Sequence, residues 1–117
     1  MAELVSRHCV PCEGGTPSLA SDEARDLVAQ VPGWSLCEGE DRIPRLQRCW
    51  RLADFTAALD LTNRIGALAE AEGHHPDLHL TGYRNLRVAL WTHAAGGLTE
   101  NDFILAAKID QLAAATR

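Results

Sequence analysis

Histidines gather at one place in this sequence. Three of the five lie in the run from Glu70 to His79, and a fourth, His93, follows after one more predicted hairpin. The imidazole ring has an unperturbed pKa of about 6.5, so it can give or take a proton near neutral pH, and it is also a common metal ligand. The adjacent pair His74 and His75, together with His93, is therefore a candidate site for acid–base chemistry or for metal binding.

The backbone around this pair is predicted to turn from a helix into a strand. Gly73 fits just past a helix C-terminus, where a left-handed residue is often needed, and Pro76 disfavours helical geometry for His75 before it. Glu70 lies one helical turn before His74, so its carboxylate could hold the His74 ring. The alternative for Glu70 is an ordinary solvated charge, which is the common state of a surface carboxylate.

Two helical patterns precede the corner. Residues 19–31 predict a short helix capped by Ser21, and residues 53–72 predict a long helix that begins at Asp54. One face of the long helix is expected to be apolar. Its residues recur every three or four positions and are Phe55, Leu59, Thr62, Ile65 and Ala69.

The remaining segments read as two hairpins and a last helix. Apolar residues alternate from 34 to 52, with Leu46, Trp50 and Leu52 on one face, and again from 78 to 93. A final helix is expected from Thr99 to about residue 115. Thr99 can cap this helix, and an acid follows three residues later, which is a typical helix start. The order α-ββ-α-ββ-α predicts an α+β two-layer sandwich, in which a four-stranded antiparallel sheet is covered by helices on one face.

Strand pairing in the second hairpin is expected to bring the histidines together. If Thr81 pairs with Leu86, antiparallel pairing places His93 opposite His74. Opposed side chains point to the same face of a sheet and lie roughly 5 Å apart at Cβ. His79 lies further along the strand and is expected to face solvent.

The whole chain limits the function classes. Its 117 residues fit a single domain, 1–117, and its net charge of −5 without a basic run argues against nucleic acid as a partner. No apolar stretch approaches the roughly 20 residues of a membrane span. The start of the chain lacks the pattern of a signal peptide, so a cytoplasmic location is expected.

The first 17 residues are predicted to form an irregular N-terminal arm, rich in glycine and proline. Cys9 and Cys12 within it have the spacing of metal or redox sites. A structural zinc site usually needs four ligands, and no second pair with this spacing follows, so an ordinary arm with reduced thiols is favoured.

An ordered set of residues resembles the pterin-4a-carbinolamine dehydratase family. The set is Glu70, then His74-His75-Pro76, the aromatic Tyr83 and the third histidine, His93. The similarity extends over about residues 32 to 112 and includes Gly33-Trp34, Asp54-Phe55 and the run from 96 to 103.

This resemblance implies dehydration of 4a-hydroxytetrahydropterin to the quinonoid dihydropterin, with no metal or redox cofactor. It implies that His74 and His93 transfer protons and that His75 orients the substrate. It also implies a homodimer or homotetramer, and substrate contacts from Glu70, Pro76, Thr92 and Trp34.

Two other functions remain open on the sequence. Three histidines and Glu70 could ligate zinc or iron. Alternatively, the chain could be a non-catalytic binding or assembly protein, because some members of the family that it resembles act as dimerisation cofactors or assembly factors.

Overall fold

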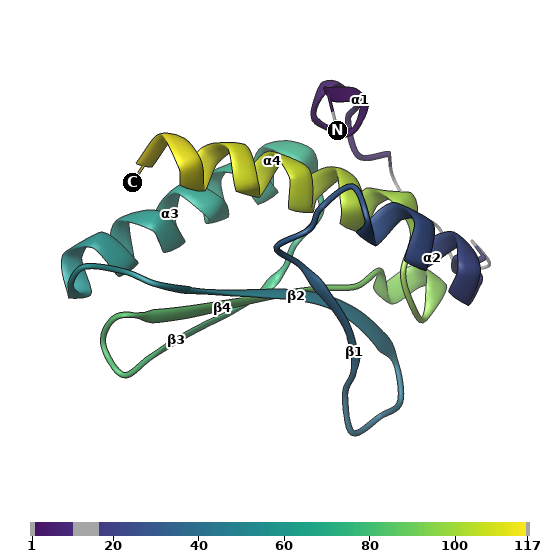
Figure 1. Cartoon of the computed structure of the whole chain (residues 1–117), viewed down its shortest axis with the longest axis horizontal. Helices are drawn as coiled ribbons and strands as arrows, with labels where there is room; N and C mark the ends of the chain where they lie inside the picture. The colour runs from purple at the N-terminus through teal and green to yellow at the C-terminus, as the bar shows by residue number, and fades with distance from the viewer. Residues whose placement is uncertain (1, 11–16, 117) are drawn as a thin grey trace.

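The protein is built on a four-stranded antiparallel sheet. The structure is a computed structural model that describes residues 2–10 and 17–116. The strands lie in the order β1-β2-β4-β3, and the helices cover one face of the sheet (Figure 1). The predicted α+β sandwich is confirmed. The described elements in chain order are α1 (Ala2–Ser6), α2 (Ser21–Val28), β1 (Ser35–Glu38), β2 (Pro44–Arg51), α3 (Phe55–Glu72), β3 (Asp77–Thr81), β4 (Asn85–Leu90), the 3-10 turn η1 (His93–Ala95) and α4 (Glu100–Thr116).

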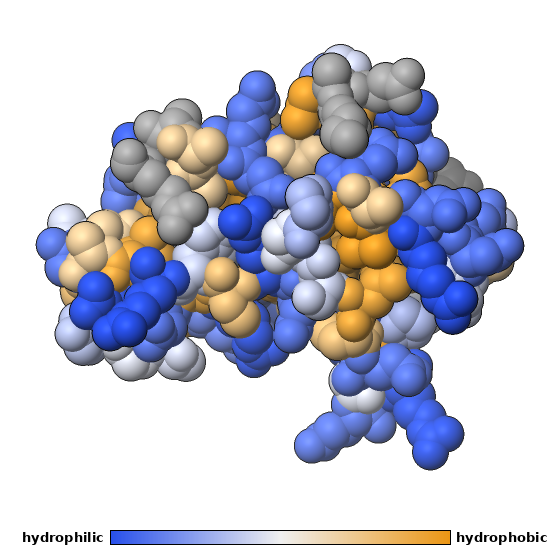
Figure 2. Space-filling model, viewed as in Figure 1, coloured by the Kyte–Doolittle hydropathy of each residue, from blue (hydrophilic) through white to orange (hydrophobic). Residues whose placement is uncertain are grey.

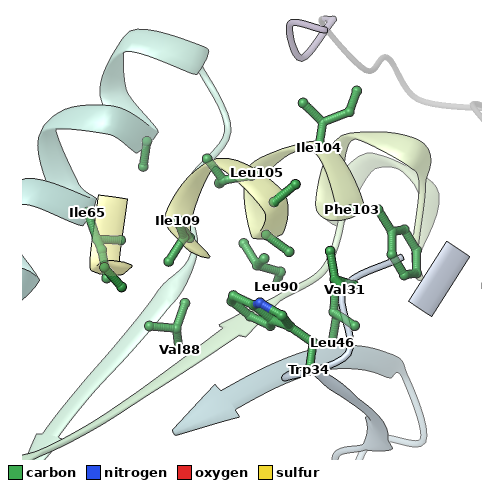
Figure 3. Close-up of a cluster of buried hydrophobic side chains, with 14 of the residues drawn as sticks. Val31, Trp34, Leu46, Ile65, Val88, Leu90, Phe103, Ile104, Leu105 and Ile109 are labelled. Atoms are coloured by element: carbon green, nitrogen blue, oxygen red, sulfur yellow. The ribbon is translucent and has the colours of Figure 1, made fainter. Parts of the chain in front are cut away.

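The core lies between the sheet and helices α3 and α4. Figure 3 shows Ile65 of α3 and Leu105 and Ile109 of α4 above the sheet residues Val88 and Leu90, all five of them buried. The apolar face predicted for the second strand is also confirmed, since Leu46, Trp50 and Leu52 are buried. A core of this size holds α3 and α4 firmly in place against the sheet, and those two helices carry the site described below.

The N-terminus differs from the prediction in two ways. Ala2–Ser6 forms helix α1 within the arm that was expected to be irregular, and Leu4 of this helix is buried in the core against α4. Helix α2 is capped at Ala20 rather than at Ser21, and the Ala20 N–H donates to the side chain of Glu23. Burial of Leu4 is a tertiary contact, which no local pattern in the first residues could indicate.

Helix α3 begins and ends where the sequence predicts. The Asp54 side chain accepts the Ala57 N–H at 2.8 Å, and Gly73 ends the helix in the left-handed conformation with φ 66°. The predicted apolar stripe is wrong for Phe55 and Leu59, which are 50% and 41% exposed. The buried face of α3 consists of Ala58, Leu61, Ile65 and Ala69.

The register of the second hairpin also differs from the prediction. Thr81 pairs with Asn85, one residue earlier than expected, and residues 82–84 make the connection. The observed register places Leu78 opposite Val88 and Leu80 opposite Leu86, so apolar side chains face one another across the strands. The predicted register would have placed Leu80 opposite Arg87.

No helix in the described ranges, 2–10 and 17–116, is both long and apolar enough to cross a membrane.

Candidate active site

A cavity of about 280 Å³ opens at the corner between α3 and β3, next to the segment that follows β4. His74 and His93, which are predicted to transfer protons, line this cavity. His75, which is predicted to orient the substrate, lines it too. The lining residues are Val10, Gly73, His74, His75, Trp91, Thr92, His93, Ala94 and Asn101. The convergence that the sequence predicted is therefore present.

The route by which His93 reaches the cavity is not the predicted one. Strand β4 ends at Leu90, and Thr92 then forms an isolated bridge with Gly97. His93 begins the short turn η1, which Gly96 closes with a φ of 66°. His93 thus faces the corner from a turn and not from a paired strand position.

His74 is held by a buried carboxylate. Its Nε2 lies 2.6 Å from Oδ1 of Asp102 in the first turn of α4, and the His74 side chain is 11% exposed. Asp102 is fully buried, and its other oxygen accepts the Thr99 N–H at 2.9 Å and the Thr92 hydroxyl at 3.0 Å. With Asp102 as a carboxylate, His74 donates from Nε2, which leaves the lone pair on Nδ1.

Glu70 does not hold His74, which corrects the sequence prediction. Its Oε1 lies 2.7 Å from Nε2 of His75 instead, and both side chains are largely exposed. The two adjacent histidines therefore have separate carboxylate partners. Only the pair of His74 and Asp102 is shielded from water, so only that pair fixes a ring firmly.

An aromatic stack positions His93. Its ring lies 3.9 Å from the Trp91 ring, centroid to centroid and tilted by 34°, and the Arg45 guanidinium lies 4.9 Å from the Trp91 centroid. Arg45 is itself held by two hydrogen bonds to Asp41, at 2.8 and 2.9 Å. The His93 ring is exposed to solvent, so it is open to exchange protons with a bound molecule.

The other predicted contact residues lie in different places. Thr92 lines the cavity, but its side chain is buried and its hydroxyl donates to Asp102. Pro76 follows His75 and is half-buried, outside the residues that line the cavity. Trp34 is in the core, where its indole N–H donates to Asp110 at 2.8 Å, so the structure does not bring it to the histidines.

The cysteine pair of the N-terminal arm is only half described, because Cys12 lies outside the described residues. Burial raises the pKa of the Cys9 thiol to about 12, and the nearby Glu72 carboxylate adds to this effect. The protonated thiol is a poor nucleophile and a poor metal ligand. Within residues 2–10 and 17–116, no three His, Cys, Asp or Glu side chains are grouped closely enough to hold a metal ion.

A larger cavity, of about 470 Å³, lies between α2 and the β1–β2 hairpin. Figure 2 shows hydrophobic side chains in this part of the visible face, surrounded by hydrophilic ones. None of the described residues that line this cavity is a histidine, and its walls include Leu19, Leu36 and Leu98. The smaller cavity is the better candidate for chemistry because its histidines have fixed partners.

Asp102 is the candidate site residue that the sequence prediction missed. The pattern Thr99-x-x-Asp102 was correctly read as a helix start, and the bond from the Thr99 N–H confirms that reading. A capping acid is usually exposed, however, whereas this one is fully buried. Asp102 lies nine residues after His93 in the sequence, and no local pattern marks it as the partner of His74.

Comparison with known proteins identifies a family of related proteins. The family model described as pterin 4 alpha carbinolamine dehydratase matches residues 17–112. An Arabidopsis thaliana protein named pterin-4-alpha-carbinolamine dehydratase 2, mitochondrial, is 49% identical over 113 residues, which are 96% of this chain and 60% of that protein. A Methylococcus capsulatus protein named for the same activity is 47% identical over 111 residues, covering 95% and 94% of the two chains.

A solved structure shares the fold. The crystal structure titled transcriptional coactivator/pterin dehydratase from Brucella melitensis superposes with a TM-score of 0.73 at 27% identity, over 82% of this chain and 98% of that one. The sequence relatives are named as dehydratases, which are hydro-lyases. Together, the match of the family model and the extent of the sequence identity show that the chain belongs to the pterin 4 alpha carbinolamine dehydratase family.

Proposed function

We propose that this protein dehydrates 4a-hydroxytetrahydropterin to the quinonoid dihydropterin. The observation that carries the proposal is the His74 ring, fixed by the buried Asp102 in the same cavity as His93. One histidine with a set tautomer and a second that is open to solvent are the two groups that a dehydration needs.

The reaction requires one acid and one base. The C4a–O bond breaks, and the hydroxyl leaves as water after taking a proton from the acid. The proton on N5 passes to the base, and the N5–H electrons form the new N5=C4a double bond. A positioned histidine side chain can serve in either role, and such a group contributes about 10²- to 10⁴-fold to the rate.

The geometry supports a division of roles. His74 acts as the base through Nδ1, because its Nε2 is engaged by Asp102. His93, exposed and stacked on Trp91, acts as the acid. His75, whose ring is bonded to Glu70 at the rim, binds and orients the pterin.

The direct test is turnover of chemically prepared 4a-hydroxytetrahydropterin by the purified protein. Formation of the quinonoid product faster than the spontaneous rate supports the proposal. A rate equal to the spontaneous one would exclude the function.

The activity is expected to need no metal. The Nε2 atom of His74 is committed to Asp102, and the Cys9 thiol is protonated, so neither is ready to bind a metal ion. Turnover should therefore stay unchanged after dialysis against a chelator. Activity lost on chelation and restored by zinc would instead favour the metal-binding function.

A second candidate function is a binding or coactivator role, because the Brucella melitensis relative is titled as both coactivator and dehydratase. The two roles can coexist on one chain. Recovery of a protein partner from the source cell by the wild type, undiminished by His74→Ala, would support a role that is separate from catalysis.

The protein is expected to form at least a homodimer. Phe55 and Leu59 lie four residues apart on α3 and expose 50% and 41% of their surface, and such paired apolar side chains favour contact with another chain. Light scattering at micromolar concentration should give at least twice the monomer mass, and Phe55→Ser with Leu59→Ser should lower it. A monomeric wild type would contradict the prediction, and Leu36→Ser is the matched control on β1.

A further inference from the structure

The described part of the N-terminal arm, residues 2–10, is fastened to the helices that build the site. Helix α1 lies beside α4 (Figure 1), and Leu4 is 2% exposed in the core. Arg7 forms an ion pair with Glu100, at the start of α4. The arm therefore has a defined path toward the cavity.

Glu72 at the end of α3 provides a second attachment. Its side chain is 8% exposed and accepts the Cys9 N–H at 2.9 Å and the Lys108 ammonium at 2.9 Å. Burial opposes ionisation of Glu72, but these hydrogen bonds outweigh it and lower the pKa of its carboxyl to about 2. A buried carboxylate that is charged at neutral pH makes each of its partners costly to remove, so the backbone at Cys9 is held in place.

Asn101 holds Val10, the residue after Cys9, by hydrogen bonds to both the N–H and the carbonyl of Val10. The amide oxygen of Asn101 accepts the Val10 N–H at 3.0 Å, and its amide nitrogen donates to the Val10 carbonyl at 2.7 Å. Asn101 is 4% exposed and precedes Asp102, the partner of His74. Adjacent residues of α4 thus hold the arm and the catalytic histidine.

Val10 lines the histidine cavity, and 64% of the surface of this residue is exposed. An apolar side chain that is left open at the edge of a polar cavity gains free energy when a ligand covers it. Valine has no group that can transfer a proton, so its contribution is to binding and not to the chemical step.

We propose that Val10 contacts the bound substrate and that Asn101 is the residue that positions it, so that the end of the described segment 2–10 forms part of one wall of the site. This inference rests on the proposed function, because the ligand is a pterin whose flat ring offers an apolar face to Val10. The arm is then a specificity element that the histidine motif does not include.

The test is a double-mutant cycle on dehydration kinetics with Val10→Ala, Asn101→Ala and the combined variant. Val10→Ala should raise KM by up to about tenfold, the effect of removing two buried methyl groups, with kcat changed less than about twofold. Asn101→Ala should raise KM at least as much, and adding Val10→Ala to it should change KM little, because Val10 is already out of place.

Several outcomes would overturn the inference. They are an unchanged KM for Val10→Ala, additive effects in the combined variant, or a fall in kcat without a change in KM. Asn101→Ser keeps a small uncharged polar side chain at this buried position, so it provides a milder test if Asn101→Ala fails to fold. Leu36→Ala, an exposed leucine of β1 outside the cavity, is the matched control and should leave KM unchanged.

A parallel binding measurement separates this inference from the proposed function. The dissociation constant of 7,8-dihydrobiopterin, a stable pterin, is measured for the wild type and each variant. A wild type that binds this pterin without turning over substrate would exclude the proposed function, while the ratio of dissociation constants still tests Val10. A wild type that turns over substrate with Val10 variants unchanged would exclude only the inference.

Discussion

Replacing His74 or His93 with alanine is expected to lower kcat by about 10²-fold or more while the fold survives. Each substitution removes one of the two groups that are proposed to transfer a proton in the reaction. The effects should be less than additive in the double variant, because residues that act in one step depend on each other. Steady-state dehydration kinetics measure the effect, and circular dichroism confirms folding.

Two neighbouring histidines serve as controls for this prediction. His75→Ala should mainly raise KM, because this ring is proposed to bind the substrate from the rim. His79→Ala should change little, since His79 is exposed on β3 and does not line the cavity. Folded His74→Ala and His93→Ala variants with near wild-type turnover would refute the proposed mechanism.

The second large effect is expected at Asp102. Asp102→Asn should lower kcat by about 10²-fold with the fold retained. The amide oxygen can still accept the Thr99 N–H, but the amide nitrogen then faces Nε2 of His74 and donates to it. The His74 proton must move to Nδ1, so the lone pair that is proposed to take the N5 proton is lost.

Asp102→Ala should also lose stability, by about 3 kcal/mol, because the buried Thr99 N–H and the His74 ring lose their acceptor. Asp110→Asn is the matched control on the same helix. Asp110 accepts from Trp34 and Arg48 and touches no histidine, so its substitution should change stability without changing kcat. Wild-type turnover by a folded Asp102→Asn variant would show that the tautomer of His74 does not matter.

Local sequence patterns were sufficient to predict the helices and strands that surround the site. Asp54 and Gly73 set the ends of α3 through capping and a left-handed backbone, which depend on the nearest residues only. Pro76 after the two histidines made the change from helix to strand predictable. The alternation of apolar residues was likewise enough to predict both hairpins and the α+β class.

The correct register of the second hairpin could also have been inferred from the sequence. Pairing Leu78 with Val88 and Leu80 with Leu86 places apolar side chains opposite one another on the face that packs against the core, and the predicted register does not. Because the side-chain period of a strand is two residues, an error of one residue moves a set of side chains to the opposite face.

Local patterns were enough to identify the three histidines, the corner that presents them and the elements on either side. Their carboxylate partners depend on tertiary packing. Asp102 lies 28 residues from His74, and Asn101 lies 91 residues from Val10, so these contacts exist only because packing sets α4 against α3 and the arm. Which carboxylate holds which imidazole depends on burial, and burial is a property of the whole packed chain and not of a local segment.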